Sequence, residues 1–535
     1  MKWSTTARAN GRNNIARLAT KLVTTAGLLA VFATVVLNTV EAGDAPVKLA
    51  ASATAPVAQP NAPAAATAAP TPDKVPAAAD GQPGAVVAKP AADGPASSPL
   101  PAVITQSLPA ATSPALPSTA MDLKAIKEAA ANFQNANPHV EEMFRAGLLN
   151  TLKQAAKQPD GTIYVGTGDI FAEWLRDSSA QVRPYLYFAK SDPAVAAFIR
   201  GVIARQMKYI TIDPYANAFK ADYAVDPIHE RKFELDSLAY PVILAWTYWK
   251  VTGDDSIFTP DFGKAMVIVL DTLIAEQDHP KNSKYTHFSL SNNGRGPEVG
   301  YTGMIWTGFR PSDDNCVYSF LIPSEMMAVV ALGDLAEIER SVYHDQAQAD
   351  RAGKLRSEVH EGIQKFGIVH DAKFGDVYAY EVDGRGNFLL MDDANIPSLL
   401  SAPYLGYVSA NNLIYRHTRK MILSASNRNF ASGSIGAGIG SEHTPKGYVW
   451  PLALIMQGIT ATSQKERQEM LDELIASDPG DHVLHESFDP NNPKVFTRKD
   501  FGWPNALFSE FMLVYFGNVA PLPTPNMTDL KYRMP

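Results

Sequence analysis

The stretch EMMAVVALGDLAEI at residues 325–338 is apolar on almost every side of the helix that it predicts. A helix of this kind must be buried all round. The stretch QAQADRAGKLRSEVHEGIQKF at 346–366 is polar except along one side. Its single apolar stripe consists of Ala352, Leu355, Val359, Ile363 and Phe366. We therefore expect an inner helix followed by an outer, amphipathic helix that covers it.

The same alternation recurs along the chain. Residues 451–460 are apolar, and the amphipathic helix after them begins at Ser463, which forms a capping-box pattern with Glu466. A further pair is expected at 234–250 and 260–277. Counted in this way, the chain contains roughly a dozen helices, which suits an all-α fold with two concentric rings of helices, a toroid.

Strand-like sequence is concentrated in VYAYEVDGRGNFLLMDD at 377–393. Asp383 and Gly384 predict a hairpin turn in this stretch. Because the surrounding chain is helical, we expect a small β-hairpin that decorates a rim of the toroid.

The first 42 residues have the pattern of an export signal. A basic start precedes an apolar stretch at 22–40, and Val40-Glu41-Ala42 places small residues where a signal peptidase cuts. The alternative is an uncleaved anchor, because 22–40 can nearly span a bilayer. Both interpretations predict an exported protein, which would be periplasmic, displayed on the cell surface or secreted.

The rest of the chain divides at about residue 120. Residues 43–120 are rich in Ala, Pro, Ser and Thr and offer few side chains to bury, so they predict a disordered linker. Residues 121–535 contain no second low-complexity break, which predicts one large domain that carries the function.

Composition excludes several classes of protein. With a net charge of -8, the chain lacks the basic surface that nucleic-acid binding requires, so we expect no nucleic-acid partner. We expect contact with a membrane only if the apolar stretch at 22–40 is not cleaved. Cys316 is the only cysteine, which excludes an intramolecular disulfide. His443 and His485 each lie beside a glutamate, but zinc-type spacing is lacking, so we expect neither a metal nor a cofactor.

Two acidic loop motifs suggest glycoside hydrolysis: FRPSDDNCVYSF at 309–320 and LHESFDP at 484–490. A glycosidase needs one carboxyl group that donates a proton and one that activates water or attacks carbon. Our candidate pair is Asp313 and Glu486. Consecutive loop residues point in different directions, so Asp314 could take the place of Asp313, or both aspartates could order the loop.

A third motif, FAEWLRDSSAQVRPYL at 171–186, combines a flat ring, a guanidinium fork and a carboxylate at the expected start of a helix. Such a mixture suits a sugar pocket, although a buried ion pair beneath a core tryptophan has the same pattern. The candidate substrate-binding residues, here and in the other loops, are Trp174, Arg176, Asp177, Trp306, Arg310, Asn315, Asp393, His443, His485 and Trp503.

Five motifs in register between about 160 and 515 resemble glycoside hydrolase family 125: WLRDSSAQVRPY, FRPSDDNCVYSF, DDANIPSLLSAPYLGY, HTPKGYVWPLALIMQG and HESFDP. The resemblance implies an (α/α)6 barrel and an exo-acting α-mannosidase that removes non-reducing α-1,6-linked mannose with inversion and without a metal. It also implies that Asp313 is the general acid and Glu486 the general base.

Inversion places demands on these two groups. The carboxyl groups should stand roughly 6.5–9.5 Å apart, and Asp313 must be kept protonated, for which Asp314 and Trp306 are possible causes. The residues leave two other interpretations open. One is a different sugar-active toroid, such as a glucoamylase-like hydrolase or a lyase, and the other is a non-catalytic glycan-binding protein.

Overall fold

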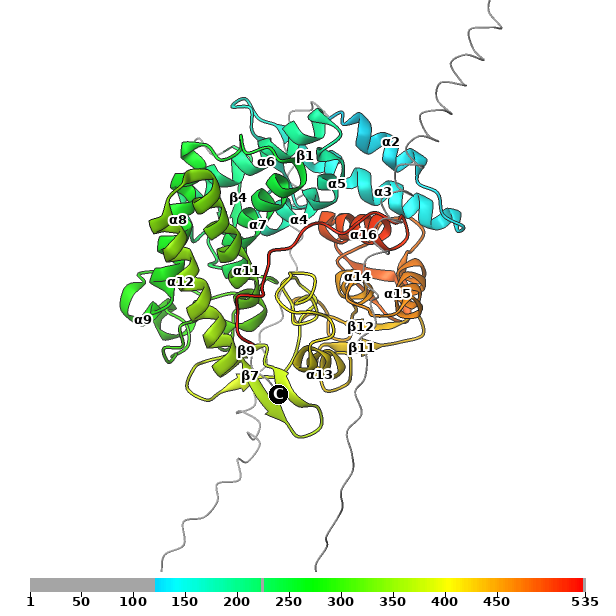
Figure 1. The fold of residues 1–535 in the computed structure, drawn as a ribbon. Helices are drawn as coiled ribbons and strands as arrows, with labels where there is room; N and C mark the ends of the chain where they lie inside the picture. The colour runs from blue at the N-terminus through cyan, green and yellow to red at the C-terminus, as the bar shows by residue number, and fades with distance from the viewer. Residues whose placement is uncertain (1–120, 223–225, 533–535) are drawn as a thin grey trace, which may run out of the picture. The chain divides into compact units, whose positions relative to one another are not determined.

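The structure, a computed structural model, describes residues 121–222 and 226–532. In this part of the chain, outer and inner helices alternate around a ring (Figure 1). The outer helices are α3 (Pro138–Gln154), α6 (Pro193–Ile212), α8 (Pro260–Glu276), α12 (Gln346–Gly362), α13 (Leu413–Ile422) and α15 (Gln464–Ser477). The inner helices are α4 (Leu175–Val182), α7 (Leu235–Thr252), α11 (Ile322–Ile338), α14 (Pro451–Ile459) and α16 (Gly502–Tyr515). The expected all-α toroid, an (α/α)6 barrel, is confirmed.

Burial separates the two rings as the hydrophobic pattern predicts. All residues of α4 and nearly all of α11 are buried, whereas α12 buries essentially one stripe against α11. Ser463 caps α15 by accepting a hydrogen bond from the Glu466 N–H (3.2 Å). The Glu466 carboxylate pairs with Arg419 (2.7 Å). Of the expected capping box, the structure therefore contains the hydrogen bond to the Ser463 side chain, while the Glu466 side chain binds Arg419.

One inner position is not helical. Between α12 and α13, residues 396–407 form successive turns where the alternation would place an inner helix. Side chains of the neighbouring helices hold this segment: Tyr240 of α7 donates to the Ile396 carbonyl (3.1 Å), and Tyr415 of α13 donates to the Leu400 carbonyl (2.9 Å). The ring therefore closes through hydrogen-bonded turns at this point.

Short helices and antiparallel strands fill the connections. The short helices are α2 (Lys124–Asn132), α5 (Leu186–Ala189), α9 (His279–Asn282) and α10 (Ser291–Gly294). The paired strands are β1 (Ala155–Lys157) with β2 (Ile163–Val165), β7 (Ile368–Asp371) with β8 (Gly375–Tyr378), β11 (Phe430–Ser432) with β12 (Ala437–Ile439), and β13 (Ser487–Asp489) with β14 (Asn492–Thr497). Two sheets have three strands: β3 (Glu173–Trp174), β4 (Ala218–Phe219) and β5 (Ile228–Glu230), and β6 (Phe320–Leu321), β9 (Glu381–Val382) and β10 (Phe388–Leu389).

The hairpin predicted at 377–393 is present as β9 and β10, with Val382 opposite Phe388. Its loop is longer than the two-residue turn expected from Asp383 and Gly384. The Asp383 carboxylate accepts the backbone N–H groups of Arg385 (2.7 Å) and Asn387 (3.0 Å), and Gly384 supplies a positive φ of 71°. A side-chain cap thus replaces the tight turn.

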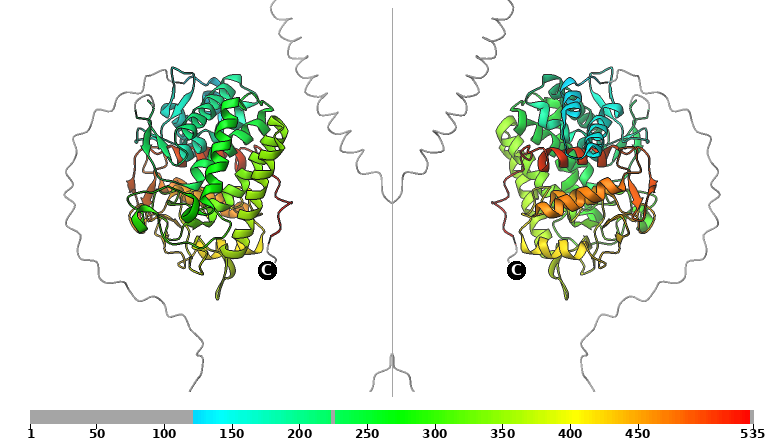
Figure 2. Two further views of the ribbon diagram at one scale, coloured as in Figure 1. Left: turned by 90° about the vertical axis from the view of Figure 1, so that its left-hand side faces the viewer. Right: turned by 90° about the vertical axis from the view of Figure 1, so that its right-hand side faces the viewer.

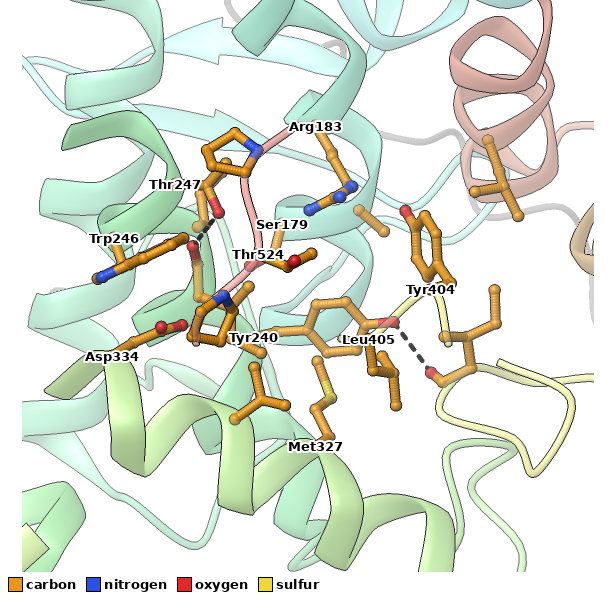
Figure 3. Close-up of a pocket in the computed structure, with 18 of the residues that line it drawn as sticks. Ser179, Arg183, Tyr240, Trp246, Thr247, Met327, Asp334, Tyr404, Leu405 and Thr524 are labelled. Carbon is orange, nitrogen blue, oxygen red and sulfur yellow. Dashed lines mark hydrogen bonds between the residues drawn. The ribbon is translucent and has the colours of Figure 1, made fainter. Parts of the chain in front are cut away.

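After α16, the C-terminal segment crosses one end of the ring (red in Figures 1 and 2). Residues 523–525 close a cavity of about 50 Å³ on the ring axis, which is lined mainly by α4, α7, α11 and α16 (Figure 3). Asp334 of α11 lies in its wall, and neither carboxylate oxygen has a hydrogen-bond partner among the described residues. Burial therefore raises the pKa of Asp334 well above its ordinary value.

The expected export segment (1–42) and linker (43–120) lie outside the described residues. Within the described part of the chain, no helix is long and apolar enough to cross a membrane.

Candidate active site

At the end of the ring where the inner helices begin, loop residues line a cavity of about 90 Å³. Trp174, Trp450 and Phe501 are the N-cap residues of α4, α14 and α16, and all three line this cavity. Because the inner helices start at the same end of the ring, the segments that enter them converge. Trp503 of α16 lines both this cavity and the axial one beyond it, so it forms the floor between them.

The cavity brings together both candidate catalytic residues, Asp313 and Glu486, although 173 positions separate them in sequence. Their side chains are 21% and 7% exposed, so both carboxyl groups are largely withdrawn from solvent. Five predicted substrate-binding residues also line the cavity: Trp174, Arg176, Asp177, His443 and Trp503.

Asp313 sits in a tight turn between Phe309 and Asn315, which pair as a β-bridge. Its φ of +66° is in the left-handed region, which aspartate tolerates better than most residues but which still costs energy. The indole Nε1 of Trp174 (3.3 Å) and the amide of Asn217 (3.0 Å) both donate to Asp313 Oδ1. The loop therefore aims this carboxyl group at the cavity and holds one of its oxygens.

Arg176 organises the charge behind Asp313. Its buried guanidinium lies 2.6 Å from Glu234, 3.2 Å from Asp236, 3.4 Å from Asp177 and 3.9 Å from Asp313. One cation thus faces four carboxyl groups. Ionising all four in a buried site would cost a large amount of free energy.

The pKa values follow from this arrangement. Burial raises the pKa values of Asp177 and Asp236 to about 6, despite the opposing effect of Arg176. Burial also raises the pKa of Glu234 well above its ordinary value. For Asp313, burial acts in the same direction, but Arg176, a hydrogen bond with Glu234 and other cations outweigh it and leave the pKa lowered. Of these two groups, Glu234 is therefore the one whose protonated form the site favours.

Glu486 directly precedes β13 and lines the cavity from a second loop. Burial raises its pKa, while Arg498, whose guanidinium lies 3.8 Å away, counteracts that rise. Arg498 is held by Asp169 (2.6 Å). The Asp169 N–H in turn donates to the Asp500 carbonyl (3.0 Å), an approach that the neighbouring Gly168 permits with a φ of +121°.

His443 lies in the wall between the two loops. Its Nδ1 is 3.4 Å from Asp314 Oδ1, and this contact raises the pKa of the imidazole. Asp314 also accepts a hydrogen bond from Ser312 Oγ (2.8 Å). The two consecutive aspartates therefore differ in place: Asp313 lines the cavity, and Asp314 orders the loop and holds His443.

Five predicted substrate-binding residues do not line the cavity. Trp306 is buried in the core, stacked on His279 with 3.7 Å between ring centroids, so it cannot be a cause of protonation of Asp313. Arg310 pairs with Glu381 of β9 (2.6 Å) and with Glu442 (2.7 Å), so it joins its own loop to two distant segments of the chain.

The other three stabilise loops in a similar manner. Asn315 donates to the Ser289 carbonyl (2.7 Å), and Asp393 accepts from Ser441 Oγ (2.6 Å). The ring of His485 stacks on Phe496 with 3.6 Å between centroids. Each residue stands next to, or near, one that does line the cavity, and residue type alone does not show which neighbour faces inward.

Several residues around the cavity were missed by the sequence analysis. Asn217, which directly precedes β4, contacts Asp313. Glu234 and Asp236 lie at the start of α7, and Arg498 and Asn395 line the wall. Glu234 and Asp236 follow a charged stretch at the start of an apolar helix, where acidic residues also serve as ordinary N-terminal residues. No local signal distinguished them.

The chemistry of the cavity is that of carboxyl groups. His443 is the only histidine in its described wall, and no group of three metal-ligating side chains in the described chain lies there. Two carboxyl groups from separate loops, in one cavity that aromatic rings and hydrogen-bond donors also line, are the groups that a glycosidase needs.

Comparisons with known proteins identify the family of the chain. A family model described as metal-independent alpha-mannosidase (GH125) matches residues 137–513. The chain belongs to this family. This GH125 enzyme is therefore a glycoside hydrolase, rather than a lyase or a glycan-binding protein.

Two relatives of the GH125 enzyme illustrate the match. The Meiotically up-regulated gene 157 protein of Schizosaccharomyces pombe is 39% identical over 413 residues, which cover 69% of this chain and 81% of the relative. A solved metal-independent α-mannosidase of Streptococcus pneumoniae is 40% identical with a TM-score of 0.69, and the match covers 74% of this chain and 96% of that chain. That structure is a non-productive substrate complex with α-1,6-mannobiose.

Proposed function

We propose that this α-mannosidase releases non-reducing terminal α-1,6-linked mannose with inversion, and that Asp313 is the general acid and Glu486 the general base. The observation that carries the proposal is the presence of these two carboxyl groups, from two separate loops, in one cavity whose floor is Trp503. A cup of this kind suits a terminal sugar. The α-1,6 linkage is supported by the ligand of the Streptococcus pneumoniae relative.

In the proposed reaction, Asp313 gives its proton to the glycosidic oxygen as the bond from that oxygen to the anomeric carbon breaks. Glu486 takes a proton from a water molecule, which attacks the anomeric carbon from the opposite face. The released mannose is therefore the β-anomer. This requires roughly 6.5–9.5 Å between the two carboxyl groups.

To act as the general acid, Asp313 must be protonated, but without substrate its lowered pKa favours the ionised form. The pKa of Asp313 is lowered and that of Glu486 is raised, which is the reverse of what their roles require during reaction. A bound sugar excludes water from Asp313 and so raises its pKa. The raised pKa of Glu234 favours its protonated form, so we assign Glu234 as the source of the proton for Asp313. Because Trp174 and Asn217 bind Oδ1, we assign the transferred proton to Oδ2.

Leaving-group chemistry tests the two roles. Asp313→Asn and Glu486→Gln should each lower turnover of α-1,6-mannobiose by at least about 10²-fold. With an activated dinitrophenyl α-mannoside, Asp313→Asn should recover most activity because the leaving group needs no acid. Glu486→Gln should recover only when azide replaces water as the nucleophile, with β-mannosyl azide as the product.

Asp314→Asn is the matched control, because it changes the neighbouring aspartate, which is not part of the cavity wall. It should keep turnover of mannobiose within a few fold. If the activated substrate instead rescued Glu486→Gln, Glu486 would be the general acid and Asp313 the general base. Near-normal turnover in both variants, or α-mannose as the first product by NMR, would refute the proposed mechanism.

We also propose that the enzyme acts outside the cytoplasm, because residues 1–42 have the composition of an export signal. Cell fractionation and mass spectrometry of the mature N-terminus test this. Full-length protein in the cytoplasm would contradict it.

A further inference from the structure

His139, Asp478 and His482 meet on the outer ring, and none of them lines the active-site cavity. His139 is the second residue of α3, Asp478 is the C-cap residue of α15, and His482 follows four positions later. Within residues 121–222 and 226–532, no other group of three His, Cys, Asp or Glu side chains lies close enough to share a metal ion. We infer that these residues form a binding site for a divalent transition-metal ion such as Zn²⁺.

The spacing of the donor atoms suits such an ion. The three ligand atoms lie within 4.8 Å of one another. Asp478 Oδ2 is 2.8 Å from His139 Nε2 and 3.4 Å from His482 Nδ1. In a tetrahedral site with bonds of about 2.0–2.1 Å, neighbouring donors stand about 3.3 Å apart. Only small side-chain movements would therefore be needed, and water would complete the coordination.

The carboxylate is held in place before any ion binds. The Asp478 side chain is completely buried, and it accepts the backbone N–H groups of Gly480 (2.8 Å), Asp481 (3.1 Å) and His482 (3.1 Å). Support of this kind is typical around carboxylates that ligate metals. Both imidazoles are partly exposed, at 31% and 40%, so an ion can reach them from solvent.

The donor set distinguishes a metal site from an ordinary ion pair. One carboxylate needs only one histidine for a charge-assisted hydrogen bond, yet here two imidazoles converge on the same oxygen, with 4.8 Å between ring centroids. Two imidazoles and a carboxylate favour Zn²⁺, Ni²⁺ or Cu²⁺ over Mg²⁺ or Ca²⁺, which prefer oxygen ligands.

The position of the site gives the ion a structural role. α3 is the first outer helix of the ring, and α15 is the last. An ion held by His139 and by the segment that follows α15 would link the two ends of the toroid. Because it would lie outside the cavity, hydrolysis would remain metal-independent, as in the family.

Zn²⁺ binding to the untagged, chelator-treated protein tests this inference. Calorimetric titration should show one ion per chain with a micromolar Kd, and Zn²⁺ in large excess over Kd should raise Tm by a few degrees. His139→Ala and His482→Ala should each weaken binding at least about tenfold and abolish the Tm shift.

His370→Ala is the matched control. His370 forms an exposed pair with Asp376 (2.9 Å) but belongs to no three-ligand group in the described chain. It should leave the affinity for Zn²⁺ and the Tm shift unchanged. No 1:1 binding at millimolar Zn²⁺, or an equal Kd in the wild type and both ligand variants, would overturn the inference. Turnover of mannobiose should not depend on Zn²⁺. A failure of Zn²⁺ binding would therefore leave the catalytic proposal untouched, and a failure of the catalytic proposal would leave the metal site untouched.

Discussion

Replacing Arg176 with methionine should destabilise the protein strongly, and more at high pH than at low pH. The guanidinium is buried and compensates the carboxyl groups at the start of α4 and α7. Removing one partner of a buried ion pair costs about 3–5 kcal/mol. Because several carboxyl groups lose the same cation, we expect about 5 kcal/mol at pH 8.

The pH dependence follows from the raised pKa values of Asp177 and Asp236, both about 6 in the folded protein. A carboxyl group with a raised folded-state pKa contributes stability below its unfolded pKa, and that contribution is lost as pH rises through the folded pKa. If loss of Arg176 raises each value by one further unit, the extra destabilisation between pH 5 and pH 8 is about 1.4 kcal/mol per group. The two groups together account for about 3 kcal/mol.

Urea unfolding of the wild type and the Arg176→Met variant at pH 5 and pH 8 measures this difference. Arg183→Met is the control, because Arg183 is partly buried and pairs with a single carboxylate, Glu510 (3.0 Å). Its destabilisation should change less between the two pH values. An Arg176→Met variant that loses less than about 1 kcal/mol, or loses the same at both pH values, would refute this account of the cluster.

Three further substitutions test individual contacts. Trp174→Phe removes the Nε1 donor to Asp313 and should lower kcat/KM about tenfold without a large change in Tm. Arg498→Gln removes a cation that lowers the pKa of Glu486, so the acidic limb of the kcat/KM profile should move to higher pH; an unchanged limb would contradict the role of Glu486 as base. Asp334→Asn removes a buried carboxyl group whose raised pKa makes the wild type less stable as pH rises, so the variant should gain at least about 1.4 kcal/mol at pH 8 and little at pH 4 by urea unfolding.

The hydrophobic pattern by itself determined the helical toroid. The apolar stretch at 325–338 became the buried helix α11, and the striped stretch at 346–366 became α12, which covers it. Burial of a helix depends on the side chains of that helix, so local sequence contains the information. The five motifs in register likewise pointed to the family that the comparisons then showed.

Only the tertiary structure decided which side chains meet in the cavity. Asp313 and Asp314 are identical in type and adjacent in sequence, yet only the first lines the wall. Glu234 and Asp236 became neighbours of Asp313 because α7 starts at the same end of the ring as the 310–314 loop, a proximity that no local pattern records. Periodicity specifies one face of a helix, whereas the direction of a loop side chain depends on contacts with segments far away in the chain.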